Sequence, residues 1–310
     1  MTQKQTVIIL GATGKTGASV ANGLIESQKF NVVAGIRPAS KNKPEVENLK
    51  SRGVEIRLVD ISAVDDSTVD ALRGLDIVIS ATDYSTISAQ KQLVDAAKKA
   101  GVKRFIPNDW ATPCVRGVRQ YYDDQKGVIQ DYIREIGLGY TFIDVGIWHQ
   151  MLPPADKSKE FYPGHIEGFT KLYDEGNVKN AFTDIRDIGT FVARIIDDPR
   201  TLNRYVFIWG EEVTKRQIID IMEKARGTKI ETTTVSLAEI EKKLTSARAA
   251  GGAAQIMAEY EYSFWVRGDN VIENAKKPEY GGALDARELY PDIKPRTLTE
   301  YAHSFYGKSN

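Results

Sequence analysis

Residues 5–17 read Gln-Thr-Val-Ile-Ile-Leu-Gly-Ala-Thr-Gly-Lys-Thr-Gly, a short apolar run followed at once by three glycines spaced three apart. Residues 18–25 then continue with a pattern typical of a helix. A strand, a glycine turn and a helix in this order are typical of a loop that binds the pyrophosphate of a dinucleotide. Glycines let the backbone approach the phosphates, and the helix N-terminus offers N–H groups to their charge. The loop residues predicted to bind the cofactor are Gly11, Thr13, Gly14, Lys15, Thr16 and Gly17.

The tripeptide Gly-Lys-Thr at 14–16 also occurs in the phosphate loop of nucleoside triphosphatases. That loop requires a glycine five positions before Gly14, where this sequence has Ile9 inside the apolar run. The spacing therefore excludes the triphosphatase class.

Further short apolar runs, rich in β-branched residues, follow in the first 145 residues, at 31–36, 54–59, 76–79, 104–106 and 140–145. They are apolar on both faces, which is typical of strands inside a parallel sheet covered by helices. Between them lie amphipathic stretches, such as 89–100, with alanine and leucine at helical spacing. We predict an α/β fold with a Rossmann-type, doubly wound parallel sheet.

The residue after the second apolar run is Arg37, at a position where NAD-binding chains carry an acidic residue for the ribose hydroxyls. A guanidinium there suits a 2′-phosphate, and Lys41 and Lys43 follow closely. The alternative is a solvated surface arginine. The sequence thus favours NADP as the cofactor. The other predicted cofactor contacts, at the ends of the third and fourth runs, are Asp60, Ala81 and Thr82.

The pattern of the sequence changes after Gln150, where prolines interrupt the alternation of apolar runs and amphipathic stretches. We predict an NADP-binding Rossmann domain over 1–150, rejoined by about 178–200, and a smaller, mainly substrate-binding region over 151–310. The small-residue segment 246–254 is predicted to be a mobile lid or an ordinary surface connection.

Two pairs of polar residues in the second region have the spacing of capping boxes. They are Thr214 with Gln217 and Ser236 with Glu239, each followed by apolar residues at helical intervals. Each pair predicts the start of a helix.

The composition limits the partners and the location of the protein. The chain has 310 residues, and its 42 Lys and Arg balance 42 Asp and Glu. Zero net charge counts against a nucleic acid as the main partner. A single cysteine, no secretory leader and no apolar span of about 20 residues favour a cytoplasmic protein without a membrane segment. No His, Cys or Asp cluster has metal-ligand spacing, so no metal is expected.

A predicted helix through residues 121–129 places a lysine among apolar side chains. At about 100° per residue, Lys126 shares a stripe with Tyr122, Ile129, Ile133 and Ile136. Lysine is rarely buried without a partner. Desolvation lowers the pKa of a lysine towards values that are useful for proton transfer. The alternative is a side chain whose stem alone is buried. Tyr122 stands four residues earlier, which is the Tyr-x-x-x-Lys spacing of short-chain dehydrogenases, although simple aromatic packing is equally compatible.

Several further segments have no counterpart in the requirements of nucleotide binding. They are Val-Lys-Arg-Phe-Ile-Pro at 102–107, Lys-Gly-Val-Ile at 126–129, Asp-Ile-Gly-Thr-Phe at 187–191, Asp-Asp-Pro-Arg-Thr-Leu-Asn at 197–203, Val-Arg-Gly-Asp at 266–269 and Leu-Tyr-Pro-Asp-Ile-Lys at 289–294. With the glycine loop, they make the chain resemble, over almost its full length, the NmrA-like atypical short-chain dehydrogenases. The resemblance is strongest to the isoflavone reductase group, which includes phenylcoumaran benzylic ether and pinoresinol-lariciresinol reductases.

This resemblance implies NADPH as the cofactor and Lys126 as a cofactor contact and the catalytic acid/base. It implies hydride transfer from nicotinamide C4 to a small aromatic, phenylpropanoid-like substrate. Lys126 would take the proton of a phenol para to a benzylic ether, a quinone methide would form, and hydride would reach the benzylic carbon.

Two departures from the plant reductases bear on the substrate. Those enzymes generally lack a tyrosine four residues before the lysine, so Tyr122 with Lys126 leaves a ketone or quinone reductase as an alternative. In addition, Asn-Asp-Trp at 108–110 replaces Ser-Glu-Phe, and Gly-Ile-Trp-His-Gln at 146–150 replaces Asn-Phe-Phe-Ala-Gly. Both segments are expected to line the pocket. The candidate substrate-pocket residues are Asn108, Trp110, Trp148 and His149.

A third alternative belongs to another class. NmrA itself is a dinucleotide-binding regulator without dehydrogenase activity, so the resemblance also admits a non-catalytic NADP sensor that binds a protein partner. Lys126 on its apolar stripe favours an enzyme. The sequence names neither the substrate nor the oligomeric state, and it leaves a homodimer open.

Overall fold

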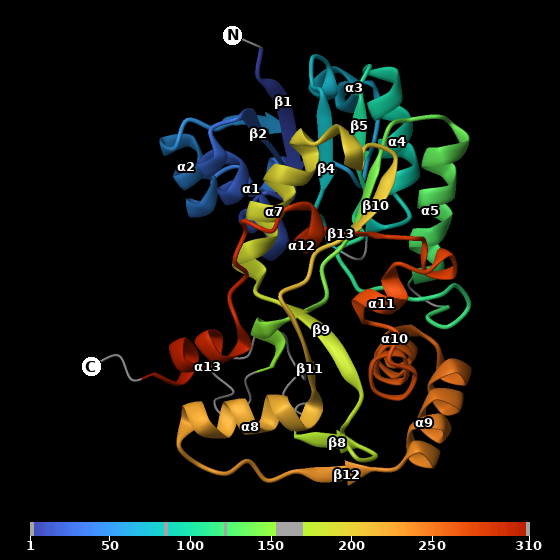
Figure 1. Cartoon of the computed structure of the whole chain (residues 1–310). Helices are drawn as coiled ribbons and strands as arrows, with labels where there is room; N and C mark the ends of the chain where they lie inside the picture. The colour runs from blue at the N-terminus through green and yellow to red at the C-terminus, as the bar shows by residue number, and fades with distance from the viewer. Residues whose placement is uncertain (1–2, 84–85, 121–122, 153–169, 308–310) are drawn as a thin grey trace. The chain divides into compact units, whose positions relative to one another are not determined.

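The computed structural model describes residues 3–83, 86–120, 123–152 and 170–307 (Figure 1). The chain folds as two compact units. The first consists of Met1–Trp110, Gln125–Ile143 and Arg186–Val206, and the second of Ala111–Asp124, Asp144–Ile185 and Phe207–Asn310. Both units are therefore built from separate stretches of sequence.

The first unit contains a five-stranded parallel sheet. Its strands are β1 (Gln5–Leu10), β2 (Phe30–Ile36), β3 (Glu55–Leu58), β4 (Ile77–Ser80) and β5 (Arg104–Ile106), in the order β3-β2-β1-β4-β5. The strand order reverses between β1 and β4, which creates the switch point where ligands bind in such sheets. The predicted doubly wound parallel sheet is confirmed, and its strands lie at the predicted apolar runs.

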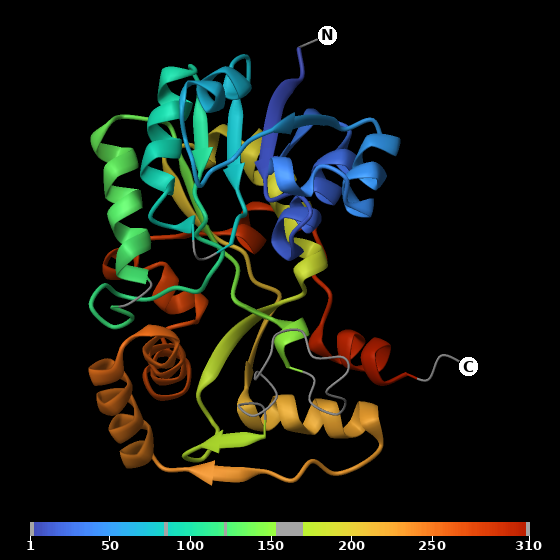
Figure 2. The ribbon, with the colours of Figure 1, turned by 180° about the vertical axis from the view of Figure 1, so that it is seen from behind.

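Helices cover this sheet. They are α1 (Lys15–Ser27), α2 (Pro44–Ser51), α3 (Asp66–Leu72), α4 (Gln90–Lys99), α5 (Asp123–Glu135) and α7 (Ile185–Asp197), with short 3₁₀ turns η1 (Pro38–Ser40) and η5 (Pro199–Thr201). Apolar residues of α3, α4 and α5 form one buried cluster with Ile8, Val78 and Phe105 of the sheet. Figure 2 shows α4 and α5 side by side, in teal and green. Burial of each such side chain contributes about 1.5–3 kcal/mol.

The return helix α7 packs directly against α1 through glycines. A Cβ added at Gly23 would lie 2.1 Å from the carbonyl carbon of Gly189. In addition, the Gly189 N–H donates a hydrogen bond of 3.0 Å to Ser19 Oγ. Only glycine permits this separation of the two helices, so the contact fixes α1 and the loop before it.

Two of the segments that carry the family resemblance meet at the end of α7. The buried Arg104 of β5 donates to the carbonyl oxygens of Ile195 and Ile196 at 3.3 and 3.1 Å. Asn203 exchanges hydrogen bonds with Tyr140, just before β6 (Thr141–Asp144). Next to β6 in its sheet lies β10 (Arg204–Phe207). These segments therefore dock α7 onto the sheet.

The second unit contains the remaining elements. They are β7 (Ile147–Trp148), η3 (His149–Met151), β8 (Lys171–Tyr173), β9 (Lys179–Thr183), β11 (Glu211–Thr214), α8 (Lys215–Arg226), β12 (Thr233–Val235), α9 (Leu237–Ala250), α10 (Gly252–Tyr262), the π-helix η6 (Ser263–Arg267), α11 (Ile272–Ala275), η7 (Pro278–Tyr280), β13 (Leu284–Asp285), α12 (Ala286–Leu289) and α13 (Leu298–Tyr306). Strands β11, β9 and β7 form one sheet, and β12 pairs in parallel with β8. Phe182, Ile218, Met222 and Leu298 belong to the core of this unit.

Local signals in the second unit have mixed outcomes. Both predicted capping boxes form, with Thr214 at the start of α8 and Ser236 at the start of α9. The segment 246–254 is mostly helical, and its connecting part is reduced to Gly251, with φ +72°, between α9 and α10. The paired glycines therefore end one helix and begin the next. Among the described residues, no helix is long and apolar enough to cross a membrane.

Candidate functional site

The glycine loop after β1 has a backbone that tolerates no side chain at two of its three glycines. Gly11 has φ +84°, and an added Cβ would lie 2.4 Å from the carbonyl oxygen of Ala81. An added Cβ at Gly17 would lie 2.0 Å from the oxygen of Gly11. Gly14 is the N-cap of α1 and makes no side-chain cap. The first turn of α1 therefore presents its N–H groups to the loop, an arrangement that fits a pyrophosphate.

The other loop residues differ in exposure. Thr16 is buried, Thr13 is half-buried and Lys15 is exposed. Partial desolvation nevertheless lowers the pKa of Lys15. A cation beside a helix N-terminus adds to the positive potential there, so the loop is electrostatically suited to an anion.

The edge formed by the ends of β2 and β3 carries Arg37 and Asp60. Arg37 is exposed and directly follows β2, and the exposed Lys41 ends the short turn η1. The Asp60 carboxylate accepts hydrogen bonds from the Ser62 hydroxyl and N–H at 2.6 and 3.0 Å. These bonds, with a smaller effect of the Arg37 charge, lower the pKa of Asp60. The structure thus brings Arg37 and Asp60 together on one edge, where their roles toward a cofactor stay a prediction.

A polar network joins the carboxyl ends of β4 and β5. The Asn108 side-chain N–H donates to the Thr82 carbonyl oxygen at 2.9 Å, and its backbone N–H donates to Gln90 Oε1 at 2.7 Å. Trp110 Nε1 donates to the Ser80 carbonyl oxygen at 2.8 Å. Thr82 also exchanges a hydrogen bond of 2.9 Å with the Thr86 hydroxyl. Asn108 and Trp110 are therefore held in defined orientations at the switch-point edge, together with Ala81 and Thr82.

Lys126 lies on α5 and has only 6% of its surface exposed. One turn later on the same helix, Gln130 Nε2 donates a hydrogen bond of 2.6 Å to Asp109 Oδ2, in the segment that follows β5. This bond ties the helix of Lys126 to the segment that carries Asn108 and Trp110. Tyr122, the second predicted catalytic residue, lies outside the described residues.

Trp148 and His149 belong to the second unit, whereas Asn108 and Trp110 belong to the first. His149 is fully buried, with its ring 5.7 Å from that of Tyr301. Its Nδ1 and Nε2 atoms each lie 3.9 Å from a carboxylate, of Asp184 and Glu211 respectively. Burial raises the pKa of Glu211. His149 is thus part of a packed charged cluster, and its place in a substrate pocket stays a prediction.

The sequence did not single out Ser80, Gln90, Asp109 or Gln130 as positioning residues. Gln90 carried a recognisable signal, because it shares the apolar stripe of α4 with Leu93 and Ala97 and has only 1% of its surface exposed. A polar residue on such a stripe requires a buried partner. Among the described residues, no group of three or more His, Cys, Asp or Glu could hold a metal ion.

The fold and the glycine loop define a dinucleotide-binding protein of the Rossmann type. The model of the NmrA-like family matches residues 3–302, and the chain belongs to this family. The resemblance inferred from the sequence is therefore confirmed.

Individual relatives are similar over nearly the whole chain. Asnovolin J 5′,6′-dehydrogenase of Aspergillus novofumigatus is 36% identical, with 97% of this chain and 95% of the relative covered. A probable pinoresinol-lariciresinol reductase of Arabidopsis thaliana is 29% identical, with 96% and 97% covered. The structure of leucoanthocyanidin reductase from Vitis vinifera with NADPH is 25% identical, covers 98% of this chain and 100% of its own, and has a TM-score of 0.83. These relatives support the prediction of an oxidoreductase, and the last one holds the predicted cofactor.

Proposed function

We propose that this protein is an NADPH-dependent reductase of small aromatic, phenylpropanoid-like compounds, with Lys126 as the residue that transfers the proton. The observation that carries the proposal is the buried Lys126 on a helix that Gln130 ties to the segment after β5. In a doubly wound sheet, this edge is where a ligand binds. The named reductases among the relatives support the reaction class.

The residues present fit NADPH. The glycine loop and the first turn of α1 would hold the pyrophosphate, Arg37 with Lys41 would hold the 2′-phosphate, and Asp60 would lie on the adenosine side. Ala81 and Thr82 would line the path towards the nicotinamide. When bound, NADPH supplies the hydride.

Lys126 would exchange a proton with the substrate phenol. A general base acts efficiently when its neutral form is accessible near the working pH, and burial favours the neutral form of a lysine. A proton-transfer group of this kind contributes about 10²–10⁴-fold to the rate.

Trp110 would form a flat apolar wall for an aromatic ring. Its indole N–H is already bonded to the Ser80 carbonyl oxygen, so the ring is held without help from a substrate. Preorganised aromatic walls with a few fixed polar groups are typical of small-molecule sites. Asn108 would supply the polar contact beside it, and Trp148 and His149 are the candidates from the second unit.

Replacement of Lys126 by alanine tests the proposal. We expect Lys126→Ala to lose turnover by about 10²–10⁴-fold, because no other group takes over the proton. The dissociation constant for NADPH should stay within about threefold of wild type, because the pyrophosphate and 2′-phosphate contacts are unaltered. The measurement is NADPH absorbance over a panel of phenolic benzylic ethers, enones, quinones and aryl ketones. The exposed Lys99 of α4 is the matched control, as Lys99→Ala, and retained turnover in Lys126→Ala contradicts the assignment.

A second candidate is a dehydrogenase that oxidises its substrate with NADP⁺. The 36% identity to a 5′,6′-dehydrogenase, against 29% to the Arabidopsis reductase, favours it. Extending the panel with saturated ring ketones, the reduced counterparts of cyclic enones, and running it in both directions separates the two: NADPH formed from the saturated ketones, with no NADPH consumed on benzylic ethers, supports the dehydrogenase.

Three further sequence-based proposals have their own measurements. Cofactor binding is assigned to residues 1–150 with 178–200, and substrate binding mainly to residues 151–310. Photocrosslinking of each ligand, followed by mapping of the labelled residues, tests this division. A homodimer is tested by light scattering in solution. A cytoplasmic location is tested by fractionation of the source cells.

A further inference from the structure

Arg119 is buried with 1% of its surface exposed, although it is not part of the predicted site. A buried guanidinium needs hydrogen-bond partners and a counter-charge. It donates to the hydroxyl and the carbonyl oxygen of Thr112 at 2.7 and 2.5 Å. Its Nε lies 2.7 Å from Oδ2 of Asp123, the first residue of α5.

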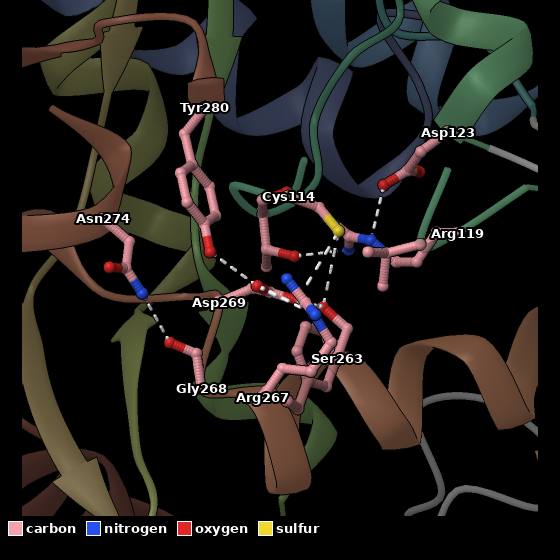
Figure 3. Close-up of polar contacts among 12 residues, drawn as sticks. Cys114, Arg119, Asp123, Ser263, Arg267, Gly268, Asp269, Asn274 and Tyr280 are labelled. Atoms are coloured by element: carbon pink, nitrogen blue, oxygen red, sulfur yellow. Dashed lines mark hydrogen bonds and ion pairs between the residues drawn. The ribbon is translucent and has the colours of Figure 1, made fainter. Parts of the chain in front are cut away.

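The Asp123 carboxylate is held from a second side by α10. The Tyr260 hydroxyl donates to Asp123 Oδ1 at 3.0 Å. The ring of the same tyrosine lies under the Arg119 guanidinium, 4.5 Å from its central carbon. Figure 3 shows Arg119 directed towards Asp123 at the start of the helix. One buried arginine and one tyrosine thus fix both oxygens of a single carboxylate.

Further contacts anchor the segment between Thr112 and Asp124. Arg248 of α9 donates to the Val118 carbonyl oxygen at 2.7 Å, and the Gly117 N–H donates to Asp124 Oδ1 at 3.1 Å. Cys114 Sγ lies 3.7 Å from Asp269 Oδ2, and burial raises the pKa of this thiol to about 11. The described residues of the segment that leads into α5 are therefore held at several points.

Asp269 is itself fully buried and accepts from three side chains besides Cys114. Tyr280 and Ser263 donate to it at 2.7 and 2.8 Å, and Arg267 Nε lies 3.0 Å from its Oδ2 (Figure 3). This network contains the Arg-Gly-Asp part of a segment that nucleotide binding does not require. Its place next to Cys114 connects that segment to the approach to α5.

Lys126 follows Asp123 by three residues within α5. Side chains three apart in a helix are neighbours, with Cβ atoms about 5–6 Å apart. The charge and the position of the first turn therefore act on Lys126 through the helix itself. A carboxylate at this place favours the ammonium form of the lysine unless a cation compensates it.

We propose that Arg119 is a positioning residue for Lys126: it fixes the first turn of α5 and neutralises the carboxylate that lies one turn before the lysine. This inference rests on the proposed function of Lys126. The charged and titratable groups that face Arg119 are the carboxylates of Asp123 and Asp144, the thiol of Cys114 and the phenol of Tyr260. Asp124 is the other acidic group in the first turn of α5, and its carboxylate bonds the Gly117 N–H.

The test compares Arg119→Gln with the double variant Arg119→Gln/Asp123→Asn. In the single variant, the Asp123 carboxylate loses the guanidinium that neutralises it. The rising limb of the plot of kcat against pH should therefore move to higher pH by about 1 unit. At a pH on that rising limb, this shift lowers kcat by about tenfold, while the dissociation constant for NADPH stays within about twofold. The double variant, which lacks both charges, should return the limb to its wild-type position.

A third variant separates charge from geometry. Arg119→Lys keeps the positive charge but not the two contacts to Thr112. The rising limb of kcat against pH should therefore keep its wild-type position, while kcat falls at all pH values. This variant and the double variant also keep the test decisive if Arg119→Gln does not fold. Arg116→Gln, at an exposed arginine of the same segment, should leave kcat and the limb unchanged.

Two results overturn the proposal. One is that the Arg119 variants keep the wild-type kcat and the wild-type pH dependence of kcat, and differ from wild type only in a lower melting temperature. The other is a limb that stays displaced in the double variant. Either result, with turnover lost in Lys126→Ala, contradicts only the role of Arg119; turnover retained in Lys126→Ala contradicts the proposed function and this inference with it.

Discussion

Lys126 and Lys215 are both buried, with 6% and 3% of their surface exposed, although lysine side chains seldom leave water. Lys215 begins α8, and its ammonium lies 4.9 Å from the centre of the Trp265 ring. Burial lowers its pKa to about 7, and the charge of Glu261 acts in the opposite direction. An attraction to an aromatic face offsets only part of the desolvation of a cation. Lys215 therefore costs the fold free energy at neutral pH.

We expect Lys215→Met to raise the free energy of unfolding by a few kcal/mol at pH 6, on the order of the shift in its pKa. The lysine binds its proton more tightly in the unfolded chain, where its pKa is 10.5, than in the folded chain, where it is about 7. The cost is therefore complete below about pH 7 and vanishes as the pH rises through 10.5. The gain from methionine should shrink over that window in urea unfolding at several pH values. Lys242→Met, at an exposed position of α9, is the control, and an equal gain at every pH contradicts the assignment.

The exposed Arg37 determines the preferred cofactor if its guanidinium holds the 2′-phosphate. A hydrogen bond to a charged group contributes about 1.5–3 kcal/mol, which corresponds to about tenfold to a hundredfold in affinity. Arg37→Asp should therefore shift the ratio of kcat/KM from NADPH towards NADH by at least tenfold. Arg73→Asp, at an exposed arginine of the first unit, should leave the ratio unchanged. An unchanged ratio in Arg37→Asp excludes the phosphate role.

At the level of elements, the contact of α1 with α7 links packing to cofactor binding. A Cβ added at Gly189 would lie 1.9 Å from the carbonyl oxygen of Ser19, so the helices must separate to admit it. Such overpacking typically costs about 1–3 kcal/mol. Because α1 begins at the glycine loop, its displacement also moves the N–H groups that face the cofactor.

We expect Gly189→Ala to lower the free energy of unfolding by about 1–3 kcal/mol and to weaken NADPH binding in the folded protein. Denaturant unfolding and NADPH titration measure the two effects separately. Thr190→Ala, at the neighbouring exposed position of α7, should change neither. Full NADPH affinity in a destabilised Gly189→Ala would show that α7 supports the fold without setting the loop.

The strands of the parallel sheet could be predicted because each lies at a short apolar run between turn residues, and period and composition suffice for such runs. Four of the five are largely buried, and only β3 has no buried residue. The capping boxes of α8 and α9 were predictable because all their hydrogen bonds lie within four residues. The joint at Gly251 was not, because paired glycines are compatible with a loop and with two helix ends. The orientation of Asn108 was also out of reach, since it follows β5 whereas its partners Thr82 and Gln90 come from the preceding connection between β4 and α4, 26 and 18 residues earlier.

On the scale of the whole molecule, the resemblance located important segments without explaining them. The segments 102–107 and 197–203 meet at the end of α7, where Arg104 bonds its last carbonyl groups. The Arg119 cluster is local only in part: Arg119 and Asp123 are four residues apart, whereas Tyr260 stands 137 positions from Asp123. Contacts over such separations follow from the tertiary fold, so a single sequence predicts the cofactor loop far better than the residues that position Lys126.

The glycine loop also predicts how the cofactor changes the stability of the molecule. A ligand that binds only the folded state at 100 times its dissociation constant raises the free energy of unfolding by about 2.7 kcal/mol. Calorimetry should show this increase in the unfolding transition of the unit that contains the loop when NADPH is added. Gly17→Ala should abolish it, because the added Cβ would lie 2.0 Å from the Gly11 oxygen and force the loop open. Gly53→Ala, where an added Cβ meets nothing within 4 Å, strains a backbone at φ +80° away from the loop. Gly53→Ala should lower the melting temperature yet keep the full stabilisation by NADPH. If Gly53→Ala also loses this stabilisation, the loss in Gly17→Ala reflects general destabilisation and not the loop.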